Sequence, residues 1–566
     1  MPAGEAVTLR RATAAALGVA MLVATWLIFY ATKGQGFAID ELPYYAHIAI
    51  DDGVIVHYDA SFSPDYLLAP FNGHLVVGGR FVYEAVFATI GAHYTAFVIV
   101  NALAICASIG LFFTYARRRI GDLAALAPAL LLLFFGIARE QFLWPFDLHG
   151  SIALAAGLGA IRSLQREGRR EDVLACFLLI VATSMIETGL AFVVGGALLI
   201  AFGADRFRRA WVVIAPVVLY AVWWVWASQF DQSETQLSNV LQAPKTAFDS
   251  IAVVLGSLTG TNSVAAATFG TDVTTLGKVL AIAALIGLAA RIYRGDLPRT
   301  IWVWLAVIAS FWTLLAVGDR SPQSTRYLLV SAVLVLLIAV DCFRRPLSNR
   351  VGAVLIVLAL LPLPANIDAM LSGKGENVLR TDVPKSRAEF AMLELSSDRV
   401  EPGYIASADP RVAEVGGDLF QAIPAGAYLS STRKNGSIAF TLAELEEQPQ
   451  EVRAIADAAL VGALRLELVS ASAPPVASNC RRSVPRQGEP SAVPLDSGNN
   501  FVRTFGPRTP LLGLRRFADS GPGVPIARLV PGGWASVRIP ADRAGAEWEL
   551  VGKAPLTVCS ISSSAS

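Results

Sequence analysis

The apolar residues of the sequence gather into eleven stretches, each long enough to be considered as a membrane-spanning helix. A helix that crosses the hydrocarbon core of a bilayer needs about 20 mostly apolar residues. Hydrophobic residues make up 54% of the 566 residues and charged residues only 16%, which excludes an ordinary soluble enzyme and a disordered chain. The predicted fold class is mainly α, a polytopic transmembrane helical bundle of about 11 spans. These begin near positions 13, 94, 121, 148, 172, 188, 210, 274, 300, 326 and 350.

Arginine residues are concentrated in alternate segments between these stretches. Arg10 and Arg11 precede the first stretch, which has no cleavage pattern after it and is predicted to be a retained helix. Because loops rich in Lys and Arg stay in the cytoplasm, the N-terminus is predicted inside and, with an odd number of spans, the C-terminus outside. The net charge of +1 shows no basic excess, so nucleic acid is not a predicted partner. Membrane lipids are predicted partners because of the apolar stretches. The other clusters occupy 117–119, 162–170, 206–209, 291–299 and 344–350.

Residues 172–203 form one long apolar stretch that is interrupted by Glu187. Arginine clusters lie on both sides, so the chain must cross outward and return within these residues. Two helices of about 15 residues rise only about 23 Å each, less than the hydrocarbon thickness of about 30 Å. We therefore expect a short helical hairpin whose tip holds Glu187 at membrane depth, where an ionisable side chain is a functional candidate. Pairing with a neighbouring Arg for structure alone is the alternative.

Two domains are predicted along the chain. Residues 1–369 form the transmembrane domain, with a first extracytoplasmic loop at 32–93, and residues 370–566 form an extracytoplasmic soluble domain. The end of the soluble domain alternates apolar and polar residues between Gly/Pro turns, which predicts strands and an α/β or β-sandwich-like fold. Cys480 and Cys559 lie in this domain, where an oxidising compartment permits a disulfide.

The first outer loop contains a pair of adjacent carboxylates, Asp40 and Glu41, soon after the first span. Adjacent carboxylates in a partly desolvated cleft raise the pKa of one of them or bind a hard divalent cation. Either arrangement suits a base that takes a proton from an acceptor hydroxyl. No spacing of His, Cys, Asp or Glu matches a recognised metal motif. The alternative is that the pair merely opens a solvated loop.

Four further side chains are predicted to bind a phosphate or another part of a substrate. His74 and Arg80 lie in the glycine-containing segment 69–87, where an Arg binds phosphate bidentately and a His donates a hydrogen bond. Arg320 and Arg326 lie on an outward turn, where basic residues are scarce in this chain. A leaving lipid phosphate needs cations near the outer surface of the membrane, where this turn is predicted to lie. A re-entrant loop for the first pair and interfacial snorkelling for the second are the alternatives.

Four short motifs together resemble the GT-C class of polytopic membrane glycosyltransferases, over roughly residues 10–350. They are IDELPYY (39–45), NGHL (72–75), IETGL (186–190) and TRYLL (325–329). The resemblance implies an external cavity where a polyprenyl-phosphate sugar meets its acceptor. It also implies that Asp40 is the catalytic acid/base residue, with Glu41 beside it. The strand-rich end is similar to a small carbohydrate-binding sandwich.

The resulting expectation is a hexosyl- or pentosyltransferase in a bacterial plasma (inner) membrane. It would transfer a sugar from a polyprenyl-phosphate donor to an extracytoplasmic glycan, lipid or protein. The sequence leaves open whether the reaction needs a divalent cation. A flippase or transporter of a lipid-linked glycan is the first alternative, although such proteins place polar groups along a path through the membrane. A non-catalytic scaffold in cell-envelope assembly is the second, and it would tolerate substitution of the first-loop carboxylates.

Overall fold

The computed structural model divides into two compact units, which are described separately. Residues 1–35 and 48–377 form the membrane unit, and residues 36–47 and 378–566 form the C-terminal unit. The segment 36–47, which belongs by sequence to the first outer loop, thus groups with the end of the chain. The structure describes 3–51, 54–58, 60, 62–166, 168–230, 236–260, 273–295, 297–372, 378–417, 422–474, 479–485, 490–505 and 509–560.

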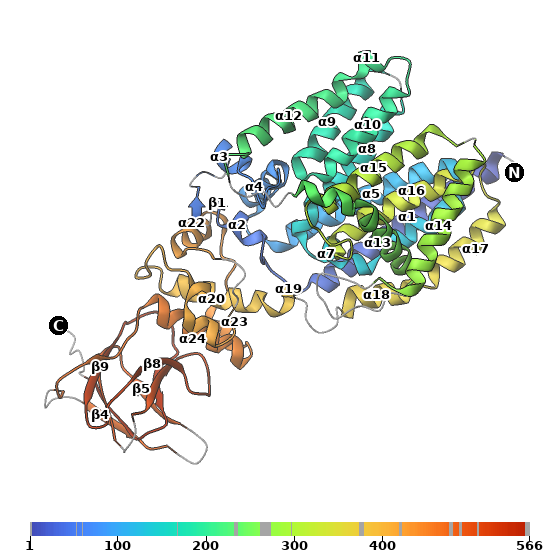
Figure 1. Cartoon of the computed structure of the whole chain (residues 1–566). Helices are drawn as coiled ribbons and strands as arrows, with labels where there is room; N and C mark the ends of the chain where they lie inside the picture. The colour runs from blue at the N-terminus through green and yellow to red at the C-terminus, as the bar shows by residue number, and fades with distance from the viewer. Residues whose placement is uncertain are drawn as a thin grey trace. The chain divides into compact units, whose positions relative to one another are not determined.

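The membrane unit is helical, and each of the eleven predicted stretches lies within its helices (Figure 1). Long runs of Leu, Ile, Val and Ala form helices here because, without water, each backbone N–H must bond within its own segment. The helices are α1 (Ala3–Thr32), α5 (Tyr94–Ile120), α6 (Asp122–Leu133), α7 (Arg139–Leu143), α8 (Leu148–Leu164), α9 (Arg169–Met185), α10 (Thr188–Ala201), α11 (Arg206–Arg209), α12 (Trp211–Ala227), α13 (Ala243–Leu258), α14 (Thr275–Tyr293), α15 (Arg299–Val317), α16 (Thr325–Asp341), α17 (Asn349–Leu360) and α18 (Leu363–Ser372).

Seven helical segments in the described part of the chain are long and apolar enough to cross a membrane. They confirm a multi-pass membrane protein, whereas the count of eleven spans and the orientation stay predictions. The remaining predicted spans correspond to α8, α9, α10 and α16, which have only 14 to 17 residues each.

The predicted helical hairpin is present as α9 and α10, which pack against each other. They are separated only by Ile186 and Glu187, and Ile186 has extended backbone angles that end α9. A Cβ atom at Gly189 would come within 2.4 Å of the backbone of Ala182 and Thr183. The glycine in the sequence IETGL therefore permits the close approach of the two helices just after Glu187.

The segment between α1 and α5 contains short elements in place of a further span. In the membrane unit it forms the hairpin β1 (Ile48–Asp51) and β2 (Val54–His57), followed by α3 (Pro64–Leu68) and α4 (Val77–Ile90). α3 is short and begins with a Ser63 hydroxyl that accepts a hydrogen bond from the Tyr66 amide. α4 packs against α9 and α5, so this segment folds over the helices that carry the site described below.

A buried carboxylate, Asp341 at the last residue of α16, joins three helices of the membrane unit. Asp341 is fully buried and accepts hydrogen bonds from the Tyr115 hydroxyl at 2.8 Å and the Thr300 hydroxyl at 2.6 Å. Arg119 Nε lies 3.3 Å from the same carboxylate. These contacts connect α5, α15 and α16 and satisfy a charge that would otherwise be costly to bury.

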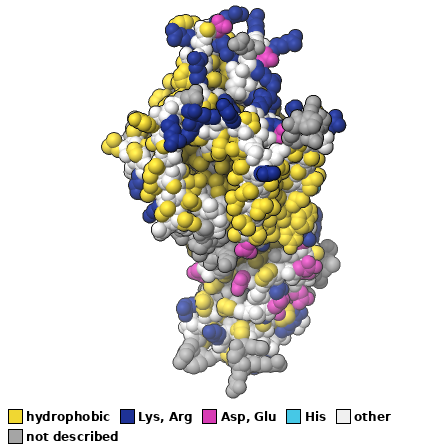
Figure 2. Space-filling view, turned by 90° about the vertical axis from the view of Figure 1, so that its right-hand side faces the viewer, with side chains coloured by type: hydrophobic (Ala, Val, Ile, Leu, Met, Phe, Trp, Pro, Cys, Tyr) yellow, Lys and Arg dark blue, Asp and Glu magenta, His cyan; other side chains and the backbone are white. Residues whose placement is uncertain are grey.

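Figure 2 shows a broad hydrophobic surface on the membrane unit, with Lys and Arg side chains gathered at the end where Figure 1 places α11. On α12, for example, Val222 and Val225 are 65% and 67% exposed. Large contiguous apolar surfaces are rare on soluble monomers and mark interaction or membrane surfaces. The basic end agrees with the arginine clusters that the sequence places at one side of the membrane.

The C-terminal unit has a helical part followed by two antiparallel sheets, so the predicted strand-rich end is confirmed. The order is β5-β10-β7-β8 in one sheet and β3-β9-β6-β11-β4 in the other. Its helices are α2 (Glu41–Tyr45), α19 (Val378–Thr381), α20 (Val383–Leu395), α21 (Pro410–Glu414), α22 (Ala425–Asn435), α23 (Leu442–Glu446) and α24 (Gln450–Ala463). Its strands are β3 (Val469–Ser470), β4 (Asn479–Ser483), β5 (Ser491–Leu495), β6 (Gly498–Thr504), β7 (Leu511–Arg515), β8 (Val524–Arg528), β9 (Trp534–Ile539), β10 (Trp548–Gly552) and β11 (Leu556–Ser560).

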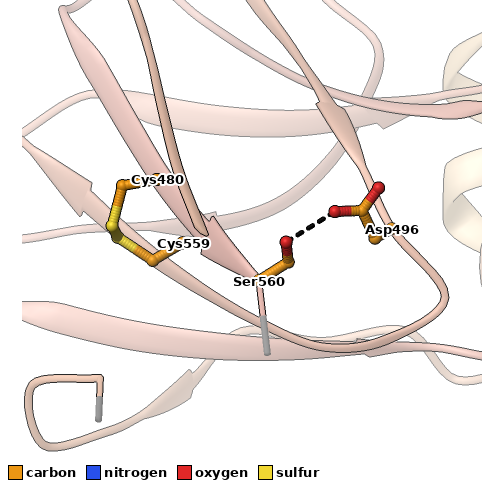
Figure 3. The surroundings of a disulfide bond; sticks show 4 residues. All are labelled: Cys480, Asp496, Cys559 and Ser560. Atoms are coloured by element: carbon orange, nitrogen blue, oxygen red, sulfur yellow. Dashed lines mark hydrogen bonds between the residues drawn. A yellow bond between two sulfur atoms is a disulfide. The ribbon is translucent and has the colours of Figure 1, made fainter. Parts of the chain in front are cut away.

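A disulfide joins the edge strand β4 to β11 (Figure 3). Cys480 and Cys559 are directly opposite each other in this antiparallel pair, which brings their side chains together. The next residue, Ser560, donates a hydrogen bond of 2.5 Å to Asp496. The disulfide therefore covalently fixes β4, whose residues are mostly exposed and bury little apolar surface.

A buried carboxylate connects α24 to the sheets. Asp457 accepts hydrogen bonds from the backbone N–H groups of Phe517 at 2.8 Å and Ala518 at 3.1 Å. Burial raises the pKa of Asp457 to about 6, although these backbone donors act in the opposite direction. The helical part and the strand-rich part of the C-terminal unit are thus linked by a buried carboxyl group.

Candidate functional site

The first part of the candidate site is a contact between an imidazole and a carboxylate, His74 and Glu187, which are 113 positions apart in sequence. His74 Nδ1 lies 3.0 Å from Glu187 Oε1, and Arg320 Nη2 lies 3.3 Å from His74 Nε2. Because a guanidinium only donates, these contacts fit a neutral imidazole that donates from Nδ1 to Glu187 and accepts at Nε2. Three of the predicted site residues are therefore brought together by the structure.

A tight turn presents His74 to its partners. Asn72 and Gly73 have φ angles of 49° and 75°, in the left-handed region that favours Gly and Asn. The turn is closed by paired backbone hydrogen bonds between Phe71 and His74, of 3.1 Å and 2.9 Å. The NGHL motif is thus a turn that fixes the direction of the imidazole.

The second part of the site is a buried carboxylate at the start of α16. Glu140 Oε2 accepts hydrogen bonds from the Thr325 hydroxyl at 2.5 Å, the Ser324 hydroxyl at 3.3 Å and the Arg326 amide at 3.0 Å. Its other oxygen lies 3.4 Å from Arg326 Nε. The side chain of Glu140 is only 4% exposed, so these donors replace its lost hydration.

Arg326 is held by further groups from the turn between α7 and α8. Its Nε lies 3.7 Å from Asp147 Oδ1, and its guanidinium carbon lies 5.1 Å from the centre of the Trp144 ring. Glu140, Trp144 and Asp147 are not among the site residues that the sequence predicts. The signal that could have found them is an acidic pair in the same kind of outward turn as the predicted arginines.

Four segments far apart in sequence therefore contribute to one region, which we call the polar cluster. Tyr327, next to Arg326, interacts electrostatically with groups from both parts of the site: Arg326 and Asp147 in one, Arg320 and Glu187 in the other. The side chains of His74, Glu187 and Arg326 are each about one quarter exposed, so the cluster is open on one side. The polar cluster comprises His74, Glu140, Asp147, Glu187, Arg320, Arg326 and Tyr327.

Arg80 occupies a different environment from the other predicted cations. It is fully buried at the start of α4, and its Nη1 donates hydrogen bonds to the carbonyl oxygens of Tyr66 and Ala69. Its guanidinium carbon also lies 4.9 Å from the centre of the Tyr66 ring. These contacts fix the loop between α3 and α4, which leads into the turn that carries His74.

Asp40 and Glu41 belong to the C-terminal unit and lie at the start of α2. Asp40 is the half-buried residue that precedes the helix, whereas Glu41 is fully buried. Glu41 Oε2 accepts a hydrogen bond from the Ala38 amide at 3.2 Å, and its own amide donates to the Ala38 carbonyl at 3.0 Å. The two adjacent carboxylates therefore differ sharply: Glu41 closes its own turn, while Asp40 reaches solvent.

The first loop contains several acidic and histidine side chains of the types that bind metal ions. In the ranges that the structure describes, no three His, Cys, Asp or Glu side chains are grouped in a way that could hold a metal ion. Asp52 and Asp59, two further acidic residues of this loop, lie outside the described residues. His47 instead lies 3.3 Å from the Ser431 hydroxyl in the C-terminal unit.

Known proteins provide few comparisons for this chain. No protein-family model and no curated protein sequence matches it. One similar solved structure is ArnT from Cupriavidus metallidurans bound to undecaprenyl phosphate, with 15% identity, 68% of this chain and 80% of that chain covered, and a TM-score of 0.33. Another is the Archaeoglobus fulgidus oligosaccharyltransferase tethered to an acceptor peptide, with 13% identity, coverage of 75% and 64%, and a TM-score of 0.37. At TM-scores below 0.5, function has to be inferred from the residues of this chain.

Proposed function

We propose that the protein is a membrane glycosyltransferase that moves a sugar from a polyprenyl-phosphate donor to a hydroxyl group of an acceptor glycan, lipid or protein outside the cytoplasm. The observation that carries this proposal is the polar cluster, where two arginines from one outward turn meet carboxylates and a histidine from three other segments. An ionic group of this kind among apolar helices suits a substrate with an apolar tail and an anionic head. A soluble sugar nucleotide would not require the apolar helices.

Arg320 and Arg326 are the proposed binding groups for the donor phosphate. Both are partly exposed, and each is already oriented by neighbours, His74 for Arg320 and Trp144 with Glu140 for Arg326. Preoriented cations stabilise the charge that develops on a departing phosphate without reorganising during the reaction. Arg80 is proposed to act indirectly, by fixing the loop that precedes the His74 turn.

Asp40 is the proposed catalytic base, because it reaches solvent whereas Glu41 is buried in its own turn. The acceptor O–H gives its proton to the Asp40 carboxylate while the acceptor oxygen forms a bond to the anomeric carbon of the sugar. The bond from this carbon to the phosphate oxygen breaks, and its electron pair leaves with the lipid phosphate. The configuration at the anomeric carbon is inverted in a single displacement of this kind. Glu41 is proposed to hold the backbone of the turn.

The test is to incubate the purified full-length protein in nanodiscs with a panel of radiolabelled polyprenyl-phosphate sugars and extracted envelope acceptors. We expect one donor to be consumed, and we expect Asp40→Asn to lower the rate about 10²- to 10⁴-fold, the usual contribution of a general base. Asp65→Asn is the matched control, because Asp65 is an exposed carboxylate elsewhere in the same loop. Addition of a chelator separates a requirement for a divalent cation from the requirement for Asp40.

Two results would reject the proposal. Full activity of Asp40→Asn would show that Asp40 is not the catalytic base. If no lipid-linked sugar were consumed, the protein would not catalyse the proposed reaction. Movement of a fluorescent lipid-linked glycan between leaflets without transfer would instead favour the flippase. A protein that does neither, with Asp40 freely replaceable, would be the scaffold.

A further inference from the structure

The segment that carries Asp40 and Glu41 is built into the C-terminal unit. Residues 36–47 group with residues 378–566, and Tyr44, Tyr45 and Ala46 are fully buried. His47 is 1% exposed. A segment of this length cannot bury two tyrosines against itself, and the contacts of Tyr45 and His47 lie on α22 and the residue that follows it.

Tyr45 is the main attachment point of this segment. Its hydroxyl lies 3.0 Å from the Thr432 hydroxyl on α22 and donates a hydrogen bond of 2.7 Å to the Gly436 carbonyl just after that helix. Its ring lies 5.9 Å from the ring of Tyr428, also on α22. Burial raises the pKa of Tyr45, so its hydroxyl remains a donor at physiological pH.

The surface that receives Tyr45 is itself fixed. Tyr428 stacks on Phe390 of α20 with 4.3 Å between ring centres, and its hydroxyl donates a hydrogen bond of 2.6 Å to Glu394. The Ser437 hydroxyl donates a second hydrogen bond of 2.6 Å to the same carboxylate. α20 and α22 therefore form a rigid receptor for the aromatic side chain of α2.

We propose that Tyr45 and Thr432 are positioning residues, and that through them the C-terminal unit carries and orients the acidic pair. α2 has only five residues, so fixing Tyr45 fixes the single turn that begins immediately after Asp40. At about 1.5 Å per residue, Asp40 lies only about 7.5 Å along the axis from Tyr45. The hydrogen bonds between Glu41 and Ala38 close the other side of the turn. The consequence for catalysis rests on the proposed function, whereas the attachment itself does not.

The attachment is tested without any activity assay, by hydrogen–deuterium exchange of the full-length protein in nanodiscs. Tyr45→Phe keeps the ring and removes both hydrogen bonds, and Thr432→Val removes one of them. We expect each variant to speed amide exchange in residues 36–47 at least about fivefold. Thr432→Ser keeps the hydroxyl and should restore protection, and Tyr30→Phe, an exposed tyrosine of α1, should change nothing there. Unchanged exchange in both Tyr45→Phe and Thr432→Val would overturn the attachment.

The catalytic consequence is tested in the transfer assay on the same variants. We expect Tyr45→Phe and Thr432→Val to lower kcat about tenfold with the KM for the lipid donor unchanged, and Thr432→Ser to restore kcat. Faster exchange with unchanged kcat, in a protein that Asp40→Asn inactivates, would refute the positioning role and leave the proposed function standing. Full activity of Asp40→Asn would refute the proposed function, and the exchange data would still decide the attachment.

Discussion

The membrane unit and the C-terminal unit use their charged side chains in different ways. In the membrane unit, residues as far apart as His74 and Arg320 meet in one half-buried cluster. In the C-terminal unit, several ion pairs are exposed, such as Arg481 with Asp496, where both side chains are more than 40% exposed, although the pair of Arg516 with Asp542 is buried. Exposed pairs of this kind contribute at most about 1 kcal/mol, whereas a buried cluster is costly to assemble. The contrast agrees with the proposal that the polar cluster is retained for a substrate.

The largest expected effect concerns the covalent bond that only the C-terminal unit contains within the described residues. Replacing both Cys480 and Cys559 by Ala should lower the free energy of unfolding of this unit by about 4 kcal/mol, because the bond closes a long loop. Limited proteolysis of the full-length protein should show faster cleavage after residue 378 and unchanged cleavage of the membrane unit. Equal protection with and without the bond would show that the sheets are stable by packing alone.

A slightly smaller effect is expected from Glu140→Gln in the membrane unit. Arg326 would lose a charged partner in a buried network, which costs about 3 kcal/mol. The measurement is the apparent Tm of the purified protein, compared with Asp519→Asn, whose carboxylate pairs with Arg453 but is 73% exposed. The control should change the free energy by less than about 1 kcal/mol. Similar shifts for both variants would remove the distinction between the units.

Arg320→Gln should lower the rate of sugar transfer about 100-fold, the usual loss when one preoriented group that stabilises developing charge is removed. The same substitution at Arg481, on the exposed strand β4, should leave the rate unchanged. The readout is initial velocity at saturating lipid donor. If Arg481→Gln were equally damaging, the C-terminal unit would also contribute charge to the reaction.

The smallest effect is a pH dependence that belongs to the C-terminal unit. Because burial raises the pKa of Asp457 to about 6, the folded state binds a proton more tightly than the unfolded state. The contribution of this group to stability is therefore greatest below about pH 4 and is lost as the pH rises toward 7, by about 2 kcal/mol. The measurement is the difference in unfolding free energy between the natural protein and Asp457→Asn from pH 4 to pH 7. This difference isolates the contribution of Asp457. A difference that is constant with pH would contradict it.

The apolar helices and the strands near the end could be predicted from the sequence, because each depends on a local pattern. The apolar stretches form helices, the arginines on both sides of residues 172–203 indicate the break at Glu187, and alternating residues near the end form strands. The number of spans and their orientation stay predictions. Glycine in IETGL is explained only by the structure, where it allows α10 to approach α9.

The meeting of distant residues could not be predicted in the same way. His74, Glu187 and the two arginines are named from the sequence as separate candidates, but nothing local indicates that His74 contacts Glu187 and Arg320. The partner of Tyr45 is 387 positions away, at Thr432, and neither residue belongs to a pattern that signals the other. Sequence patterns report which side of an element is buried, whereas such pairings are decided by how complete elements pack.

The polypeptide passes between the two units at three places, after residues 35, 47 and 377. A unit appended by simple terminal fusion would need only one such passage. If recombination exchanged residues 378–566 alone, Tyr45 would meet a surface in which the residues at positions 432 and 436 can differ. The short inserted segment and the distant end of the chain must therefore be inherited together, and any chimaera between relatives of this protein should transfer them as a pair.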